Sequence, residues 1–282
     1  SLSLSVGTGI NTVTHFKDFS LLQSSSTEWL GFDRCARPLS KDFPSHLGSM
    51  TDPSQITYYT KTGFNNDWNV KTFRPLPDLK LNLTWNRKIG DKVGTILTFG
   101  YSNANKTIPD MQNTRYGIYS ATADVPTIEK NYIDNQFTNE VKINAMNNWS
   151  FILDSRNRFE FRNLFSQIGK NRFTERYGTS TVSGEYYENQ TEMLYSSRLS
   201  YVGQLAGLHT LDEDMTQTLN WTVDYSYANK MEPDRRIIKN IGGIPADKVI
   251  TPDLPSYNDM INRYDQKLYD HIASVGADYK KS

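Results

Sequence analysis

Few side chains in this sequence stand at spacings that support catalysis or metal binding. The four histidines, His15, His46, His209 and His271, are far apart and form no metal-ligand spacing. The sequence has no nucleophile elbow, no zinc-protease helix motif and no phosphate-binding loop. Its single cysteine, Cys35, has no histidine close by. We therefore expect no catalytic residues, no metal site and no cofactor.

Charged residues instead alternate with apolar ones along extended stretches of the chain. They are Lys80, Lys142, Arg158, Glu160, Arg162, Arg198 and Asp224. A carboxylate pair of the kind that glycosidases use cannot be singled out among them. On the lipid face of a membrane β-barrel each cation would cost roughly 2–4 kcal/mol at mid-bilayer. In such a barrel these charges would face the interior, either as a mutually paired wall or as a path that guides solute.

The composition excludes several classes of protein. The 282 residues carry 31 basic and 31 acidic side chains, so there is no broad basic face for nucleic acid. No apolar stretch reaches the length of a transmembrane helix, no signal peptide is present, and one cysteine cannot form an internal disulfide. The mean hydropathy of −0.62 with 12% aromatic residues still fits a transmembrane β-barrel, in which alternating side chains average out.

The elements that position these charges are strands, because apolar residues recur at every second position. The clearest run is Leu219, Trp221, Val223, Tyr225 and Tyr227, with polar residues between them. The predicted strands are 1–12, 78–89, 92–104, 138–153, 157–170, 190–210, 215–228 and 267–281. The sequence thus predicts an all-β, antiparallel, up-and-down fold of about eight strands.

Short and long connections alternate between these strands. Tight turns are expected at 90–91, 154–156 and 211–214, and long connections at 13–77, 105–137, 171–189 and 229–266. Every second connection of an up-and-down sheet lies at the same edge, so this alternation predicts short turns at one rim and long loops at the other, as in outer-membrane barrels. Helical spacing predicts short helices over about 53–61 and within 252–268.

Aromatic residues lie near the strand ends on the apolar side of the alternation. They are Trp85, Tyr101, Trp149, Tyr227 and Tyr279. These are positions at which the interfacial aromatic girdle of a membrane barrel would lie. Aromatic residues also favour strands in general, so the pattern alone does not separate the two explanations.

Four stretches resemble a known family when they are taken together and in order. They are WLGFDRCARPLSKDFP (29–44), after the opening strand SLSLSVGTGINTVTHFKDF, then FNNDWNVKTFRPLPDLKLNL (64–83), YVGQLAGLHTL (201–211) and LNWTVDYSYANKMEPDRR (219–236). In this order they resemble the barrel domain of TonB-dependent outer-membrane receptors of the Bacteroidetes type. The resemblance covers nearly the whole chain.

The resemblance implies a 22-stranded barrel closed by an N-terminal plug, in the outer membrane of a Gram-negative bacterium. It implies active import of a scarce solute, such as a siderophore, cobalamin, glycan or peptide, bound by the extracellular loops and the lumen. The energy would come from the TonB–ExbB–ExbD complex acting through the plug. The implied partners are outer-membrane lipid, that complex, the solute and a surface lipoprotein, with no nucleic acid.

By the same resemblance the chain is expected to be one part of a receptor. Residues 1–19 resemble the first barrel strand, no plug or TonB box precedes Ser1, and eight strands are about a third of such a barrel. We therefore expect residues 1–282 to form a single domain, the N-terminal portion of the barrel, with the plug domain absent.

A charged cluster at the end of the fourth stretch supplies the candidate site. Glu232, Asp234, Arg235 and Arg236 follow a predicted strand and are expected at the extracellular rim. They are candidates for contact with the solute. The other interpretation is a solvated loop base that ion pairs hold together.

Two other functions stay open. Eight strands can close by themselves, so the chain could be an independent eight-stranded outer-membrane barrel that serves as an anchor or adhesin. Pairing of the first strand with the last would indicate that barrel, and unpaired outer edges would favour part of a larger one. A soluble binding module or β-rich hydrolase would instead be extracted into buffer without detergent.

Overall fold

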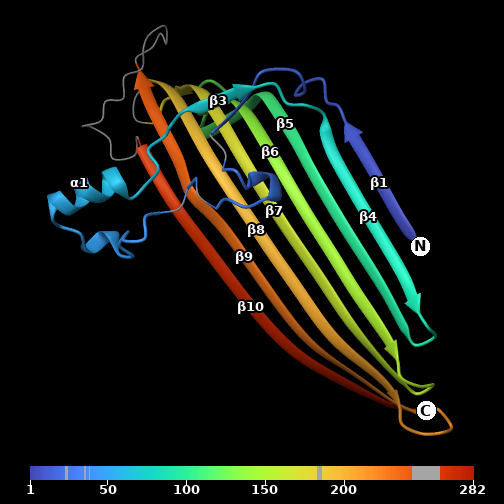
Figure 1. The fold of residues 1–282 in the computed structure, drawn as a ribbon. Coiled ribbons are helices and arrows are strands. Elements are labelled where there is room, and N and C mark those ends of the chain that lie inside the picture. Colours follow the sequence, from blue (N-terminus) through green and yellow to red (C-terminus); the bar gives the residue numbers. More distant parts are fainter. Residues whose placement is uncertain (23–24, 35, 38, 183–185, 243–260) are drawn as a thin grey trace.

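One large antiparallel sheet dominates the computed structural model, which describes residues 1–282 apart from 23–24, 35, 38, 183–185 and 243–260. The strands of this sheet, in spatial order, are β1 (Leu2–Gly9), β4 (Asp78–Ile89), β5 (Val93–Ser120), β6 (Val125–Ile152), β7 (Asn157–Ser180), β8 (Tyr186–Thr210), β9 (Gln217–Gly242) and β10 (Ile261–Lys281). Figure 1 shows them side by side as a curved and twisted wall with β1 and β10 at its edges.

The eight strands expected from the alternation of apolar and polar residues are confirmed. Each pairs antiparallel with its neighbour in the sheet. The turns at 90–92, 153–156 and 211–216 are short and lie at the same end of the sheet. The sequence therefore located the sheet and its order correctly.

The strands are longer than predicted, and the long loops expected at 105–137, 171–189 and 229–266 are wrong over most of their described length. β5 and β6 have 28 residues each and stay paired as far as Ser120 and Val125. In these extensions apolar residues are fewer and no longer fall at every second position, so the alternation fades while the backbone ladder continues. The register shifts between Ile108 and Met111, around Pro109, because proline cannot donate to the ladder.

One of the two predicted helices is confirmed. α1 (Pro53–Thr62) begins after Asp52, whose side chain accepts a hydrogen bond from the Ser54 N–H at 2.8 Å. The second prediction, within 252–268, is wrong for 261–268, which belong to β10 because β9 offers them a free edge to pair with. Residues 252–260 lie outside the described part of the chain.

The sheet has one apolar and one polar face, because side chains alternate along each strand. One row of directly paired residues runs Leu83, Phe99, Ala145, Phe165, Tyr201, Tyr227 and His271. The adjacent row on the other face runs Asn82, Gly100, Asn144, Ser166, Ser200, Ala228 and Asp270. We call these the apolar face and the polar face.

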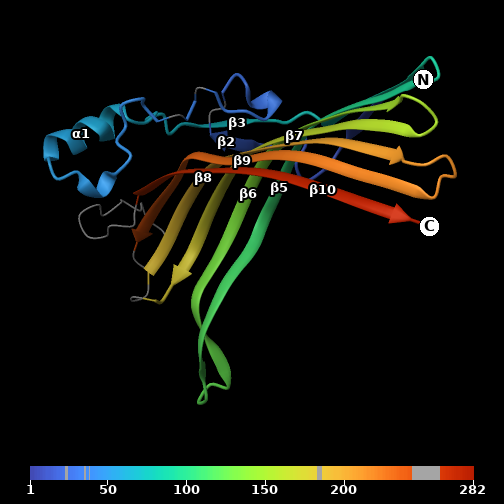
Figure 2. The same ribbon diagram turned by 90° about the horizontal axis from the view of Figure 1, so that it is seen from below.

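The first long connection, here named the 10–77 segment, lies against the apolar face at the end far from the short turns (Figures 1 and 2). It contains β2 (Phe19–Leu22), η1 (Glu28–Leu30), η2 (Leu47–Ser49), α1 and β3 (Val70–Phe73), and β2 pairs with β3. Phe19, Leu21 and Leu22 are buried with Phe173 and Met193 of the large sheet. The segment is thus a packed cover with its own small core.

Candidate functional site

The structure brings two of the four rim candidates together and buries them. Asp234 and Arg236 are only 2% and 1% exposed. Arg236 donates to Asp234 Oδ2 from Nε at 3.0 Å and from NH2 at 2.6 Å. Arg263 of β10 donates to both oxygens of the same carboxylate at 2.7 Å. One buried carboxylate therefore holds two guanidinium groups.

These two arginines also hold the 10–77 segment. Each donates to the backbone oxygen of Asn65 at 2.7 Å. Their guanidinium groups lie 4.7 and 5.1 Å from the centre of the Trp68 ring. We name Asp234, Arg236, Arg263, Asn65 and Trp68 the Asp234 clamp. It fastens the segment to β9 and β10, and solute binding by Asp234 or Arg236 stays a prediction.

The other two rim candidates, Glu232 and Arg235, make separate ion pairs. Arg235 pairs with Glu192 of β8 at 2.5 Å, and Glu232 pairs with Lys230 at 2.6 Å. Asp234 has a positive φ of 49°, at a point where the register between β8 and β9 is shifted. The four residues therefore do not converge on one site.

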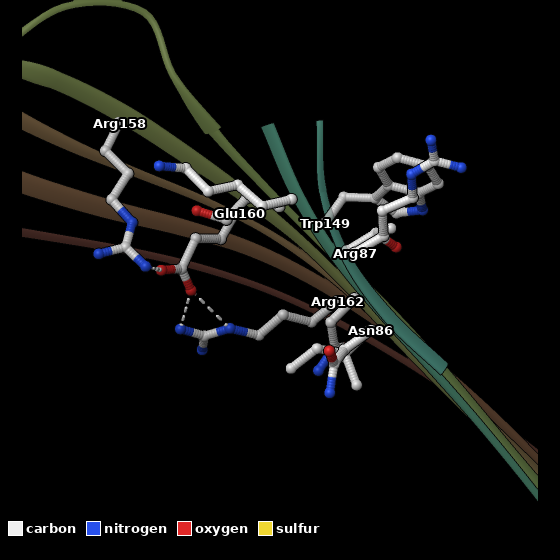
Figure 3. Close-up of a pocket in the computed structure, with 12 residues that line it drawn as sticks. Asn86, Arg87, Trp149, Arg158, Glu160 and Arg162 are labelled. Carbon is white, nitrogen blue, oxygen red and sulfur yellow. Dashed lines mark hydrogen bonds and ion pairs between the residues drawn. The ribbon is translucent and has the colours of Figure 1, made fainter. Parts of the chain in front are cut away.

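A pocket of about 380 Å³ opens on the polar face near the short turns, and two arginines and a glutamate of β7 line it. Arg158 NH2 lies 2.7 Å from Glu160 Oε1, and Arg162 donates from Nε to Glu160 Oε2 at 2.9 Å. Figure 3 shows both guanidinium groups turned toward the carboxylate of Glu160. With two cations on one carboxylate, the lining carries a net positive charge at this point.

A ladder of side-chain hydrogen bonds continues from this pocket across the neighbouring strands. Arg162 NH1 donates to Gln204 Oε1 at 2.7 Å, and Gln204 Nε2 donates to Asp224 Oδ1 at 2.6 Å. Ser274 of β10 donates to the other oxygen of Asp224 at 3.4 Å. The ladder joins β7, β8, β9 and β10 on the polar face.

The charges predicted to share one face are thus largely found on it and paired. Lys142 and Lys170 share Glu140, at 2.5 and 2.9 Å. Among the described residues, Lys80 and Arg198 form no ion pair. The arrangement is a mutually paired polar wall whose half-exposed arginines can donate hydrogen bonds to a solute.

A second buried ion cluster joins Glu28, Asp33 and Arg37, at the start of the stretch 29–44 that carries part of the family resemblance. Arg37 NH1 donates to Glu28 at 2.6 Å and to Asp33 at 3.1 Å, and its guanidinium lies 4.7 Å from the Tyr195 ring centre. Burial lowers the pKa of Arg37, but Glu28 and Asp33 outweigh burial and raise this pKa above its ordinary value. Asn171 donates to Glu28 at 3.0 Å, so the cluster ties the segment to β7.

The histidines and carboxylates offer no metal centre in the described part of the chain, where no group of three potential ligands comes together. His15 lies 3.1 Å from Asp78, and His209 contacts Asn157 and Trp221. Within the same residues, no helix has both the length and the apolar character needed to cross a membrane.

Comparisons with known proteins identify no relative of this chain. No family model matches the chain, and neither a curated protein nor a solved structure matches it. The two faces of the sheet, its open edges and the polar ladder therefore carry the functional conclusion.

Proposed function

We propose that this chain forms part of the wall of a TonB-dependent transport barrel in the outer membrane of a Gram-negative bacterium. The observation that carries the proposal is the separation of apolar and polar side chains onto the two faces of one eight-stranded sheet. In the proposed arrangement the apolar face contacts lipid and the polar face lines the lumen. The chain would serve import of a scarce solute, not catalysis.

The apolar face supports this orientation because its side chains are exposed over a wide area. Leu205, in the middle of the sheet, is 42% exposed, and Val275 near the edge is 80% exposed. Monomeric soluble proteins rarely expose contiguous apolar patches larger than a few hundred Å². The acyl chains of a bilayer would cover this area and so remove the unfavourable contact between its apolar side chains and water.

Aromatic residues border the exposed part of the apolar face on both sides. Trp149, Trp221 and Tyr279 lie toward the short turns, and Tyr101, Tyr201 and Tyr227 lie toward the 10–77 segment. On β9 the two borders are six residues apart, or about 20 Å at ~3.3 Å per residue. An outer-membrane barrel carries an apolar band of about 25 Å between two such girdles.

The polar face supports a water-filled lumen. Many of its residues are Asn, Ser, Thr or Gly, with a row of Met146, Leu164 and Val202 among them, and most of its charges pair with one another along the sheet. Arginines such as Arg158 and Arg162 would each cost roughly 2–4 kcal/mol if they faced the middle of a bilayer. In water they keep their hydration and can contact a passing solute.

The edges of the sheet favour a larger barrel over an independent eight-stranded anchor or adhesin. In the described residues β1 pairs only with β4 and β10 only with β9, and Figure 1 shows the two at opposite sides of the wall. An exposed edge strand invites further pairing. In the proposed receptor, further strands would close the barrel, and TonB–ExbB–ExbD would act through a plug domain within it.

Loss of uptake in the intact bacterium tests the proposal. The coding sequence of the protein is deleted, and solutes that remain in the spent medium are compared between the deletion strain and its parent. We expect at least one solute to be depleted by the parent alone, and a protonophore to abolish that depletion because TonB draws on the inner-membrane potential. Identical depletion by both strains would contradict the proposal, as would recovery of the protein in buffer without detergent.

A further inference from the structure

The turn at η1 lies directly on the apolar face and is held there by its backbone. Gly31 has a positive φ of 79°, and its oxygen accepts a hydrogen bond from Gln167 Nε2 at 2.5 Å. A Cβ on Gly169 would come within 2.5 Å of the Gly31 Cα, so the two glycines allow a direct backbone contact. The buried Glu28–Arg37 pair holds the turn from behind.

The turn reaches the border of the exposed apolar area. The Tyr101 hydroxyl donates to the backbone oxygen of Trp29 at 3.0 Å. Tyr101 belongs to the same row as Ile143, Gln167 and Leu199, and the next row toward the short turns begins with Phe99. The 10–77 segment thus covers the apolar face only as far as the row of Tyr101, where the aromatic border of the exposed area begins.

Two aromatic side chains of this turn are exposed although its backbone is fixed. Trp29 is 59% exposed and Phe32 is 38% exposed, whereas Glu28 between the segment and the sheet is buried. Trp29 also lines a cavity of about 870 Å³ together with Leu22, Phe73 and Asn103. The cavity therefore combines apolar walls with amide groups at the level of the aromatic border.

We infer that the η1 turn is an anchor that places Trp29 and Phe32 among the lipid headgroups at the border of the apolar face that lies beside the 10–77 segment. An indole combines an apolar ring with one N–H donor and is enriched at membrane interfaces for that reason. The cavity beside Trp29 gives a headgroup room to contact Asn103 while the acyl chains cover the apolar face. The inference rests on the proposed function, because it requires a bilayer against that face.

Quenching of tryptophan fluorescence by brominated lipid tests the anchor. The intact barrel protein that contains residues 1–282 is reconstituted into phosphatidylcholine vesicles whose acyl chains carry bromine either near the headgroup or near the bilayer centre. The emission of Trp29 is obtained by subtracting the emission spectrum of the Trp29→Phe variant from that of the native protein. If Trp29→Phe folds poorly, Trp29→Tyr is used for the same subtraction. We expect this difference to be quenched more strongly by the shallow bromines than by the deep ones.

Trp68 provides the matched control from the same segment. It lies under Arg236 and Arg263 in the Asp234 clamp, so the emission lost in Trp68→Phe should be insensitive to either bromine position. If Trp85, Trp149 and Trp221 are quenched but Trp29 is not, the anchor is wrong and the membrane wall stands. If no tryptophan is quenched, the membrane wall and the anchor are both overturned.

Discussion

The Asp234 clamp makes a quantitative prediction about how firmly the 10–77 segment is held. Asp234→Asn keeps the shape of the side chain but removes the negative charge that faces Arg236 and Arg263. Breaking a buried ion pair by removing one partner typically costs about 3–5 kcal/mol, because the remaining charge is left uncompensated. The side chains of Asp234 and Arg236 are each 1% exposed, so solvent screens this loss little. Since every 1.4 kcal/mol is tenfold, local opening of the segment should rise by roughly 10² to several times 10³.

Tryptic cleavage after Lys71 measures this opening. Lys71 lies in β3 and pairs with Leu21 of β2, so the chain must open locally before the protease can cut it. When opening is fast relative to cleavage, the cleavage rate follows the population of the open form. The fragment ending at Lys71 is followed by mass spectrometry in the native chain and in Asp234→Asn.

Glu232→Gln is the matched control, because Glu232 lies two residues away on the same strand and makes an ordinary pair with Lys230. Such a partly exposed pair is worth about 0.2–1 kcal/mol, so cleavage should rise by less than about fivefold. Equal rates for Asp234→Asn and Glu232→Gln would refute the assignment of the clamp as the fastening of the segment.

Three further predictions concern the faces, the turn and the helix. Leu205→Arg on the apolar face should destabilise the intact barrel in vesicles by roughly 2–4 kcal/mol, measured by denaturant titration, whereas Ala206→Arg, opposite Glu160 on the polar face, should cost far less; equal losses would contradict the assignment of the faces. Gly169→Val should displace the η1 turn, because even a Cβ at Gly169 would meet the backbone of Gly31, and an unchanged Trp29 emission spectrum would count against that contact. Asp52→Ala should speed hydrogen exchange in α1 at neutral pH. The side-chain hydrogen bond from Ser54 lowers the pKa of Asp52, so the cap stabilises α1 above the ordinary pKa and is lost only as pH falls through the lowered one. Once the slower chemical step of exchange in acid is corrected for, the protection factor of the α1 amides should therefore fall in acid in the native chain and not in the variant.

The central parts of the strands could be predicted because one face of each is apolar. In β9 the run from Leu219 to Tyr227 alternates cleanly, and the structure places it in a strand with the expected faces. All five aromatic residues chosen for a girdle lie on the apolar face by register, Trp85 and Tyr279 among them. Period-two alternation reports burial or lipid contact on one side, which is why it succeeds there.

The strand extensions could not be predicted because their apolar residues do not alternate regularly. Between Asn105 and Phe137 apolar residues such as Ile108, Ile118 and Ile128 are scattered among polar ones, and the pairing is set by the backbone ladder of β5 with β6. The same reason explains the missed start of β10, where Ile261, Tyr264 and Leu268 happen to fall at helical spacing. Stretches rich in Asn, Thr, Gly and Asp resemble turns in composition, but here they continue as paired strands.

The contacts of the 10–77 segment could not be predicted from the sequence because they join residues that are far apart in the chain. Gln167 contacts Gly31 across 136 positions, and Arg236 contacts Asn65 across 171. A buried Arg236 and a half-buried Arg235 are neighbours in sequence and so lie on opposite faces, and the bulge around Asp234 decides which of the two faces the segment. The charged cluster at 232–236 does mark a contact site. Its residue types alone, however, do not reveal that Asp234 and Arg236 bind another segment of the same chain.

Environment-sensitive labels on two adjacent residues test the central claim most directly. Val223→Cys and Thr222→Cys, each in the intact barrel protein with Cys35→Ser and any other cysteine replaced, are labelled with a fluorophore whose emission shifts to shorter wavelength in lipid, and the protein is reconstituted into phosphatidylcholine vesicles. Val223 pairs with Leu205 on the apolar face, and Thr222 pairs with Ala206 on the polar face. The proposed wall predicts a blue-shifted label at 223 that iodide does not quench, and a water-exposed label at 222 that iodide quenches. Equal quenching at both positions, or the reverse order, would contradict it.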